Sequence, residues 1–439
     1  MSGAFDNIHP TLSFEGALNI LAEKENNLKC SSDYYMAVSH LLNFPCQRTE
    51  DVLLGVASNE SDSQAVRLAR RKSVEVLGRF GCKRALPILA KCLDHSDRYL
   101  VENAVWSLLQ IGCQDPTIHQ RLIGLLDEDQ GNQRIIIQCL AGLAVRDATD
   151  MIQKCLKSPV VSVQTAAGSA LCRLLGDRSY VSDLKPVLFS ASQMDRQMVI
   201  EDLADCKGIE LIDSVLKSPV SPVFRMRFVK AVSSEQSANS STRFSLIDKL
   251  DQILVDSPKS LLLSSCFDGY ASVKDYFDGL FSNDFARCYH CLDRLSDMEG
   301  RIIWPIFLQK WYESAFNDYG AHYFFLRLVG LASGWPAECV SRLEDILLEA
   351  VDNRRPQFSK SRHIALLSYF NLSPEKITAD FLLRIIEPSD RSWQLQYAVL
   401  MIAEQLQVER VVLLHEYFGD RKTTSLHPFV QAKLIRFLS

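Results

Sequence analysis

The sequence predicts an all-α protein, a right-handed solenoid built from stacked helical hairpins. Three observations support this prediction. Apolar residues recur at steps of three and four along most of the 439 residues, which is the spacing of one helix face. No segment shows the alternating pattern of a β-strand. A helix-ending glycine recurs 31 residues apart, at Gly81 and Gly112, in the matching segments LGRFG and LLQIG.

The same unit continues downstream of this first pair. Because one helical hairpin cannot bury its own apolar face, copies must stack to share a core. A period of about 30 to 45 residues with two helices per unit is typical of HEAT-like repeats. A leucine that ends the first helix of each hairpin recurs at intervals of 28 to 33 residues, at Leu93, Leu126, Leu156, Leu188 and Leu216.

The chain divides into four segments by pattern. Residues 1–32 form an N-terminal cap with a lead-in helix, and residues 33–233 hold the HEAT-like repeats, beginning with SSDYYMAVSHLLNFP as the first hairpin. The polar stretch at 234–243 is a loop. Residues 244–439 continue as irregular helical repeats, in which helical periodicity persists but the period weakens; a separate helical domain is the alternative.

Composition excludes several classes of protein. The net charge is −5 and no basic stripe occurs, which argues against nucleic acid as the partner. No apolar run is long enough to cross a bilayer, so membrane insertion is not expected. The start of the chain lacks a cationic segment followed by an apolar one, and we expect a soluble, cytoplasmic protein.

The 13 cysteines are predicted to be buried core residues rather than disulfides or metal ligands. The pair Cys288 and Cys291 forms the CxxC of CYHC, but a second ligand pair is missing nearby. We therefore predict no metal site, and a structural role for this motif.

The second helix of each hairpin is expected to line the inner surface of the solenoid. Two exposed residues four apart lie on one face of such a helix. A tryptophan at such a position is unusual, because a large aromatic surface is rarely left in water. Trp106 is therefore a candidate floor for a flat, anionic ligand; the alternative is that it fills a gap between repeats. The predicted inner pairs are Arg71 and Glu75, Glu102 and Trp106, Arg134 and Gln138, and Thr165 and Ser169.

A second candidate region is rich in aromatic residues. Nine of the residues from Trp304 to Phe325 are aromatic, and the turn FNDYGAH in their midst has the signature of a helix start. This turn brings the side chains of Asp318, Tyr319 and His322 to one helix N-terminus. The alternative is that Asp318 only caps the helix and Tyr319 is a surface aromatic.

At this point the sequence resembles a known family. The segments VRLARRKSVEVLGRFG and DRYLVENAVWSLLQIG, with Glu102 and Trp106 in a Glu-x-x-x-Trp pattern, resemble the phycobilin lyases of the E/F type. Together with SSDYYMAVSHLLNFP, they are most similar to the subgroup acting on phycoerythrins, which includes lyase-isomerases. The resemblance covers residues 30 to 190 well and the remainder in general character.

The resemblance implies a lyase that delivers phycoerythrobilin to a cysteine of a phycoerythrin alpha or beta subunit, forming a thioether. The bilin is then a substrate, and no cofactor is permanently bound. If the lyase-isomerase subgroup applies, phycoerythrobilin becomes phycourobilin, which needs an acid and a base near ring A. Tyr319 is the predicted proton donor, and Asp318 is the acceptor or the partner of a bilin nitrogen, with His322 as the reserve. The predicted bilin-binding residues are Arg71 and Arg134 for the propionates, Glu102 for the pyrrole N–H groups, Trp106 for stacking, and His322 and Tyr323.

Two other functions stay open at this stage. Most helical solenoids are non-catalytic interaction scaffolds, which is what the fold alone predicts. A bilin carrier or phycobilisome-degradation factor would hold the pigment without forming a thioether. The sequence leaves the acceptor cysteine and the oligomeric state undetermined.

Overall fold

The structure is a computed structural model that describes residues 11–128, 132–233, 240–263, 269, 272–385, 392–406 and 426–438. Within these ranges all regular secondary structure is helical and no strand occurs. The predicted all-α solenoid of HEAT-like hairpins is confirmed. None of the helices in these ranges has the length and apolarity needed to cross a membrane. The backbone divides into two compact units, Met1–Asp183 and Leu184–Ser439.

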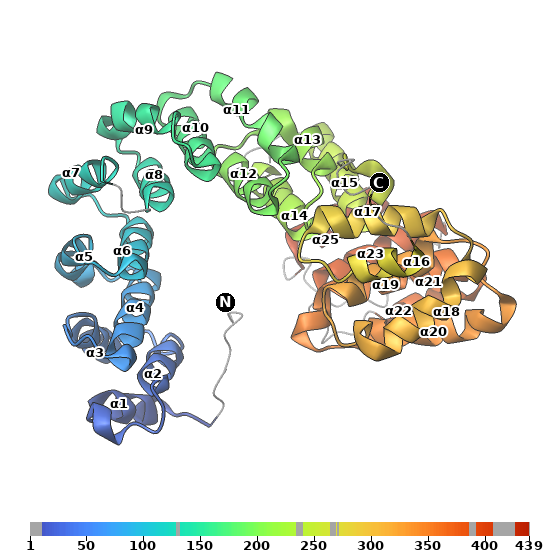
Figure 1. The fold of residues 1–439 in the computed structure, drawn as a ribbon, viewed down its shortest axis with the longest axis horizontal. Coiled ribbons are helices and arrows are strands. Elements are labelled where there is room, and N and C mark those ends of the chain that lie inside the picture. The colour runs from blue at the N-terminus through green and yellow to red at the C-terminus, as the bar shows by residue number, and fades with distance from the viewer. Residues whose placement is uncertain are drawn as a thin grey trace. The chain divides into compact units, whose positions relative to one another are not determined.

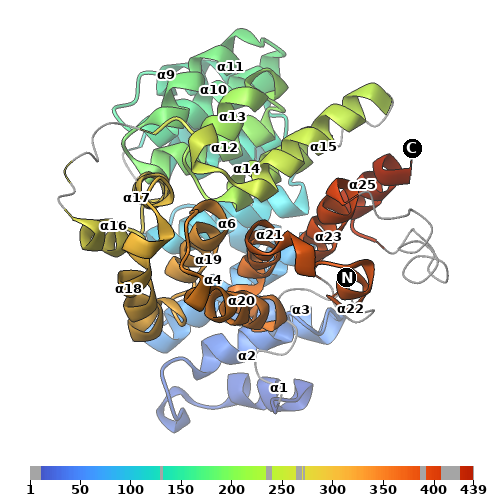
Figure 2. The same cartoon turned by 90° about the vertical axis from the view of Figure 1, so that its right-hand side faces the viewer.

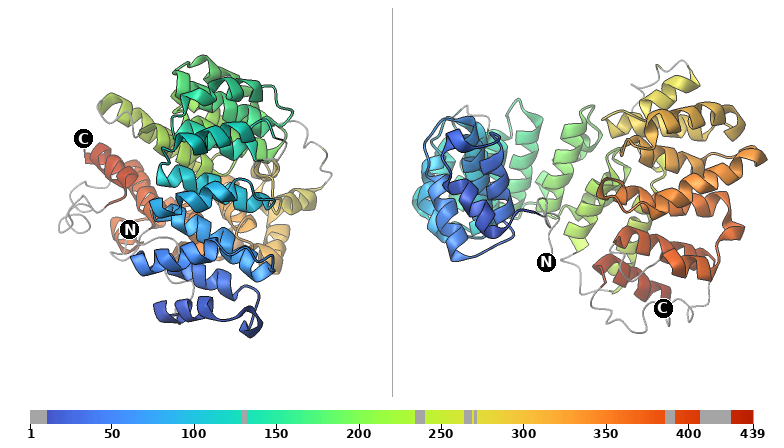
Figure 3. Two further views of the ribbon diagram at one scale, coloured as in Figure 1. Left: turned by 90° about the vertical axis from the view of Figure 1, so that its left-hand side faces the viewer. Right: turned by 90° about the horizontal axis from the view of Figure 1, so that it is seen from below.

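Unit 1 consists of five helical hairpins followed by a short helix (Figures 1 and 3). In each hairpin the second helix packs against the second helix of the next, so that α2, α4, α6, α8 and α10 form one inner row. The pairs are α1 (Phe14–Ala22) with α2 (Asp33–Leu41), α3 (Gln47–Ala57) with α4 (Gln64–Arg79), α5 (Leu86–Cys92) with α6 (Arg98–Ile111), α7 (Pro116–Leu125) with α8 (Gln133–Gly142), and α9 (Thr149–Cys155) with α10 (Val161–Leu175), before α11 (Ser179–Asp183).

The repeated glycines end helices of the inner row, as predicted. Gly112 is the C-cap of α6 with φ +70°, and Gly81 follows α4 with φ +66°. These are left-handed conformations, which glycine adopts without a steric cost. The repeated leucines also lie where the sequence places them: Leu93, Leu126 and Leu156 directly follow α5, α7 and α9.

The start of the array differs from the prediction. The segment 31–45 was expected to contain a whole hairpin, but it forms the single helix α2, whose partner is α1. The Tyr34 hydroxyl joins the two by donating a 2.7 Å hydrogen bond to the carbonyl oxygen of Glu23. The segment is too short for two helices, and the predicted lead-in helix supplies the missing half.

Unit 2 is a second helical array (Figure 2). Its inner helices α17, α19, α21, α23 and α25 pack in succession, and α15 contacts α21, α23 and α25. Part of the predicted loop at 234–243 lies outside the described residues, which resume with α15. The helices are α12 (Gln193–Asp205), α13 (Ile212–Lys217), α14 (Pro222–Ser233), α15 (Ser240–Val255), α16 (Val273–Gly279), α17 (Phe285–Ser296), α18 (Gly300–Lys310), α19 (Ala321–Leu331), α20 (Ala337–Asp352), α21 (Arg362–Leu372), α22 (Ala379–Ile385), α23 (Trp393–Gln405) and α25 (Pro428–Leu438).

A buried lysine joins α15 to the last helices of unit 2. Lys433 of α25 is fully buried, and its Nζ lies 2.7 Å from Oδ2 of Asp251 and 2.6 Å from Oε2 of Glu404. The Tyr397 hydroxyl donates to Oδ1 of Asp251 at 2.6 Å. Because a buried charge is tolerated only when it is paired, these contacts fix α15 against α23 and α25.

The cysteines of the described segments behave as core residues. Ten of them are buried, and only Cys30 and Cys46 are exposed. Cys288 and Cys291, the residues of the CxxC, lie in the buried face of α17. No cluster of His, Cys, Asp or Glu suited to a metal ion occurs in the described residues.

Candidate functional site

Arg71 lies on the inner row of unit 1 but is engaged by a neighbouring repeat. Its Nε and Nη2 donate to the two carboxylate oxygens of Asp97 at 2.7 and 2.8 Å. Asp97 also caps α6 by accepting from the backbone N–H of Tyr99. Burial acts to raise the pKa of Asp97, but the bonds and charge of Arg71 outweigh it and lower the pKa. The guanidinium of Arg71 thus already has a carboxylate partner, which a bilin propionate would have to displace.

The two predicted inner residues of α6, Glu102 and Trp106, each have an arginine side chain beside them. Oε1 of Glu102 accepts from Nε of Arg98 at 3.2 Å. The guanidinium of Arg79 lies 5.5 Å from the ring centroid of Trp106, which is half-buried, and Arg79 is also held by Glu75 at 2.8 Å. Trp106 thus retains accessible surface and has a cation beside its ring.

The inner row becomes more closed toward its end. Nη1 of Arg134 donates to the carbonyl oxygen of Ser162 at 2.6 Å, which ties α8 to α10. Thr165 and Ser169 were predicted to face solvent, but each is only 3% exposed. The prediction is wrong because α10 carries small and apolar residues all round, so that nearly every side of it is buried.

In unit 2, Asp318 acts as a helix cap. Its Oδ1 accepts hydrogen bonds from the backbone N–H groups of Gly320 and Ala321 at 2.9 and 2.8 Å, at the start of α19. The side chain is exposed and does not line the pocket described below. Asp318 thus caps α19 through Oδ1, and its other carboxylate oxygen, Oδ2, stays outside the cap.

His322 was predicted to contact a ligand, and its position contradicts this. It is 3% exposed and packs between the rings of Trp311 and Phe358, with centroids 5.1 and 4.7 Å away. Burial lowers its pKa from 6.5 to about 4, so the ring is neutral at pH 7. The side chain points into the core because the face of α19 that carries His322 packs against the preceding π-helix, Trp311–Ala315.

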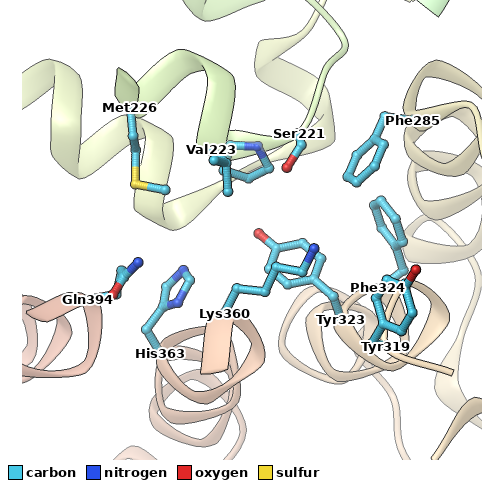
Figure 4. Close-up of a pocket in the computed structure, with 12 residues that line it drawn as sticks. Ser221, Val223, Met226, Phe285, Tyr319, Tyr323, Phe324, Lys360, His363 and Gln394 are labelled. Atoms are coloured by element: carbon cyan, nitrogen blue, oxygen red, sulfur yellow. The ribbon is translucent and has the colours of Figure 1, made fainter. Parts of the chain in front are cut away.

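The remaining aromatic residues of this region meet at a pocket within unit 2 (Figure 4). Tyr319 and Tyr323, both predicted site residues, line it. Its unfilled space is about 390 Å³, including the part open to solvent. The residues that line it come from α14, α17, α19, α21, α23 and the adjoining turns: Ser221, Pro222, Val223, Met226, Phe285, Tyr319, Gly320, Tyr323, Phe324, Lys360, His363 and Gln394.

Two basic side chains of the pocket, Lys360 and His363, have no hydrogen bond or ion pair with the described residues. Nζ of Lys360 lies 5.7 Å from the ring centroid of Tyr319, and no ion pair or hydrogen bond to it occurs among the described residues. Burial lowers the pKa of Lys360. His363 is 2% exposed, and neither ring nitrogen has a partner in the described part of the chain. Burial also lowers its pKa to about 4.

Behind the pocket lies a buried ionic network centred on Asp256. Oδ1 of this carboxylate accepts from Arg225 at 2.6 Å, and Oδ2 accepts from the hydroxyls of Tyr289 and Tyr323 at 2.7 and 2.6 Å. The backbone of Asp256 is left-handed, with φ +48°. Tyr323 therefore contributes its ring to the pocket wall, while its hydroxyl is directed into the network.

No sequence pattern marks Lys360, His363 or Asp256 as a site residue. They lie in segments with ordinary helical periodicity, PQFSKSRHIALL and ILVDSP, and none belongs to a motif. A charged or imidazole side chain within an otherwise apolar face, as in RHIALL, is a weak signal of a buried polar group. Nothing in the local pattern shows that such groups meet at one pocket.

Fold and site together define a HEAT-repeat α-solenoid with an aromatic-lined pocket in its second unit. The family of HEAT repeats matches residues 60–133. The chain is 34% identical to "Bilin biosynthesis protein CpeY" of Synechococcus sp. (strain WH8020) over 92% of this chain and 96% of that protein. It is 25% identical to "Phycocyanobilin lyase subunit alpha" of Nostoc sp. (strain PCC 7120), over 46% of this chain and 79% of that protein.

Among solved structures, the complex of CpcE and CpcF of phycocyanin lyase from Nostoc sp. PCC7120 matches with a TM-score of 0.48 and 24% identity. The match covers 56% of this chain and 96% of that chain. The full-length similarity to CpeY decides the classification. The chain belongs to the phycobilin lyases of the E/F type.

Proposed function

We propose that this protein attaches phycoerythrobilin through a thioether to a cysteine of a phycoerythrin alpha or beta subunit and isomerises it to phycourobilin. The observation that carries the proposal is the pocket of unit 2. Its aromatic walls suit a flat chromophore, and the unpaired Lys360 suits a carboxylate. The relative named as a bilin biosynthesis protein, which aligns along nearly the whole chain, supports the same assignment.

The attachment step needs orientation rather than a nucleophile of this chain. The thiol of the acceptor subunit adds to the exocyclic double bond of ring A, so that a C–S bond forms and the thiol proton passes to the bilin. A protein that holds the extended pigment in one shape beside the thiol lowers the entropic part of the barrier. Ten described cysteines of this chain are buried, consistent with a role in which none of them carries the pigment.

For the isomerisation we assign Tyr319 as proton donor and Asp318 as acceptor. The double bond between rings A and B moves into ring A, so one carbon gains a proton and another loses one. Tyr319 is 60% exposed and lines the pocket, and no hydrogen bond to its hydroxyl occurs among the described residues. Oδ2 of Asp318, two bonds from the capping oxygen, is the site that accepts a proton or a pyrrole N–H.

Residues of unit 1 are proposed as further bilin contacts. Trp106 is partly exposed and offers ring surface for stacking, and Arg134 lies on α8, the next helix of the inner row. Arg71 and Glu102 contribute only if a propionate or pyrrole group replaces their present partners, Asp97 and Arg98. Replacing Trp106 by alanine is expected to lower the yield of attached pigment without unfolding α6.

The decisive experiment is co-expression of the protein with phycoerythrobilin and individual phycoerythrin subunits, followed by mass analysis and absorption spectroscopy of the subunit. The proposal predicts a covalent adduct with the mass of one bilin and the absorption of phycourobilin. A purified protein that leaves the pigment spectrum unchanged is a scaffold. One that binds pigment but yields no adduct is a carrier.

The catalytic assignment has its own variants. Tyr319→Phe and Asp318→Asn are expected to leave phycoerythrobilin attached but not isomerised. Tyr312→Phe is the matched control. Tyr312 is an exposed tyrosine of the same aromatic segment, and its hydroxyl accepts a hydrogen bond from Arg342. Full conversion to phycourobilin by both site variants contradicts the assignment.

A further inference from the structure

His363 is a buried polar group without the hydrogen-bond partners that such groups normally have among the surrounding residues of the described chain. It is 2% exposed, lines the pocket, and has no hydrogen bond at either ring nitrogen within the described segments. An unpaired buried donor or acceptor costs free energy, which a ligand that pairs with it recovers. A neutral imidazole offers one N–H donor and one acceptor.

Gln394 of α23 lies beside His363 and supplies a complementary group. In Figure 4 the two side chains are together at one end of the pocket, while Phe285, Phe324 and Tyr319 are at the other. The half-buried carboxamide of Gln394 has no protein partner among the described residues. A carboxamide carries a donor and an acceptor side by side, the same arrangement as the N–H and C=O of a lactam.

The size of the pocket limits what it can hold. The 390 Å³ of unfilled space includes the part open to solvent, and the enclosed part is only a small fraction of it. The walls around it are mostly apolar and include Met226, Phe285 and Phe324. One substituted five-membered ring suits such a space, and a whole tetrapyrrole does not.

Lys360 lies between the two ends of the pocket (Figure 4). Its ammonium group faces the ring of Tyr319 and has no carboxylate partner in the part of the chain that the structure describes. A desolvated lysine without a counter-ion attracts an anion more strongly than a hydrated one on the surface. A propionate on the ring next to a bound terminal ring supplies such an anion.

We propose that the pocket binds one terminal lactam ring of the linear tetrapyrrole, with Gln394 and His363 hydrogen-bonding the lactam and Lys360 pairing with a propionate of the adjoining ring. This inference rests on the proposed function, because it takes the bilin as the ligand. It adds the part of the bilin that is recognised and the residues that recognise it. The remaining rings extend out of the pocket past Tyr319.

The test is a titration of free phycoerythrobilin into the purified full chain, followed by absorption and by quenching of tryptophan fluorescence. Gln394→Leu, His363→Leu and Lys360→Met are each expected to weaken binding about tenfold, the effect of losing one hydrogen bond or ion pair to a buried site. Lys259→Met is the control, because Lys259 is exposed and pairs with Asp297 on the surface.

Two features distinguish ligand recognition from a structural role. His363→Leu removes an unpaired polar group from the core, so it is expected to bind bilin less well while its thermal stability stays the same or rises. Lys360→Met is expected to weaken binding of phycoerythrobilin but not of its dimethyl ester, in which both propionates are neutral.

Three results overturn the inference. If the wild type binds phycoerythrobilin and all three pocket variants bind equally well, the bilin lies elsewhere, and the proposed function stands without this pocket. If Lys360→Met weakens binding of the ester as strongly as that of the acid, the lysine does not pair with a propionate. If the wild type does not bind phycoerythrobilin at all, the proposed function fails together with the inference.

Discussion

The hydroxyl of Tyr323 donates a 2.6 Å hydrogen bond to Oδ2 of Asp256, a residue 67 positions earlier in the chain. Burial, followed by the charge of Asp256, raises the pKa of Tyr323 well above its usual value. Tyr323 therefore keeps its proton, which it donates to Asp256 within the core, whereas the hydroxyl of Tyr319 is exposed. The two tyrosines line one pocket, but only the hydroxyl of Tyr319 is open to a ligand.

Loss of the Asp256 charge is expected to destabilise unit 2. Asp256→Asn keeps the shape of the side chain but leaves Arg225, which is 1% exposed, without a counter-ion. Breaking a buried pair in this way costs about 3–5 kcal/mol. The measurement is chemical denaturation followed by circular dichroism. Asp345→Asn, in an exposed pair with Arg342, serves as the control and is expected to leave the midpoint unchanged. Equal midpoints for both variants contradict the role given to Asp256.

Two glycine substitutions on inner and outer helices are expected to have opposite effects. A Cβ at Gly78 of α4 would overlap the side chain of Ser107 on α6, where the hydroxyl donates to the carbonyl oxygen of Val74 at 2.9 Å. Gly78→Ala is therefore expected to cost about 1–3 kcal/mol.

The matched substitution is Gly55→Ala on α3. Gly55 is exposed, and a Cβ there meets nothing within 4 Å, so the helix gains about 0.5–1 kcal/mol from alanine. Melting temperatures of the two variants should move in opposite directions. If Gly78→Ala melts at the same temperature as the wild type, α4 and α6 pack less closely than they do in the structure.

Stability should depend on pH through two buried histidines. The pKa of His322 and of His363 falls from 6.5 to about 4 on burial, so the unfolded chain binds protons between these values and the folded chain does not. Each of the two residues therefore lowers stability by roughly 3 kcal/mol as pH falls from 6.5 to 4. Above pH 6.5 neither contributes.

The variant His363→Leu isolates one of these contributions. Denaturation midpoints of wild type and variant are compared at pH 7 and pH 4.5, and the variant is expected to lose less stability on acidification. Parallel pH curves for the two proteins show that His363 does not remain neutral in the folded state below pH 6.5.

Thiol reactivity should separate the surface from the core. A hydrogen bond with Ser32 lowers the pKa of Cys30, and one with Thr49 lowers that of Cys46. Burial raises the pKa of Cys139 to about 12. Alkylation of the native protein at pH 8, mapped by peptide mass analysis, is expected to modify Cys30 and Cys46 long before Cys139. Early modification of Cys139 indicates that α8 is more accessible than described.

The sequence alone determined the repeat. Helical periodicity, the left-handed glycines after α4 and α6 and the leucines after α5, α7 and α9 are local properties, because each is set by residues within one hairpin. The helix start at Asp318 was predictable for the same reason. The resemblance in residues 30 to 190 further indicated the lyase family.

Only the tertiary structure decided how the polar groups are used. Periodicity shows which face of a helix is buried, but not which buried groups meet. The register placed Arg71 on the inner surface, and the next repeat supplied Asp97 as its partner. The pocket joins residues from α14 to α23, and the carboxylate behind it pairs with groups 31 and 67 positions away. Such contacts depend on how helices pack over long separations, which no local pattern encodes.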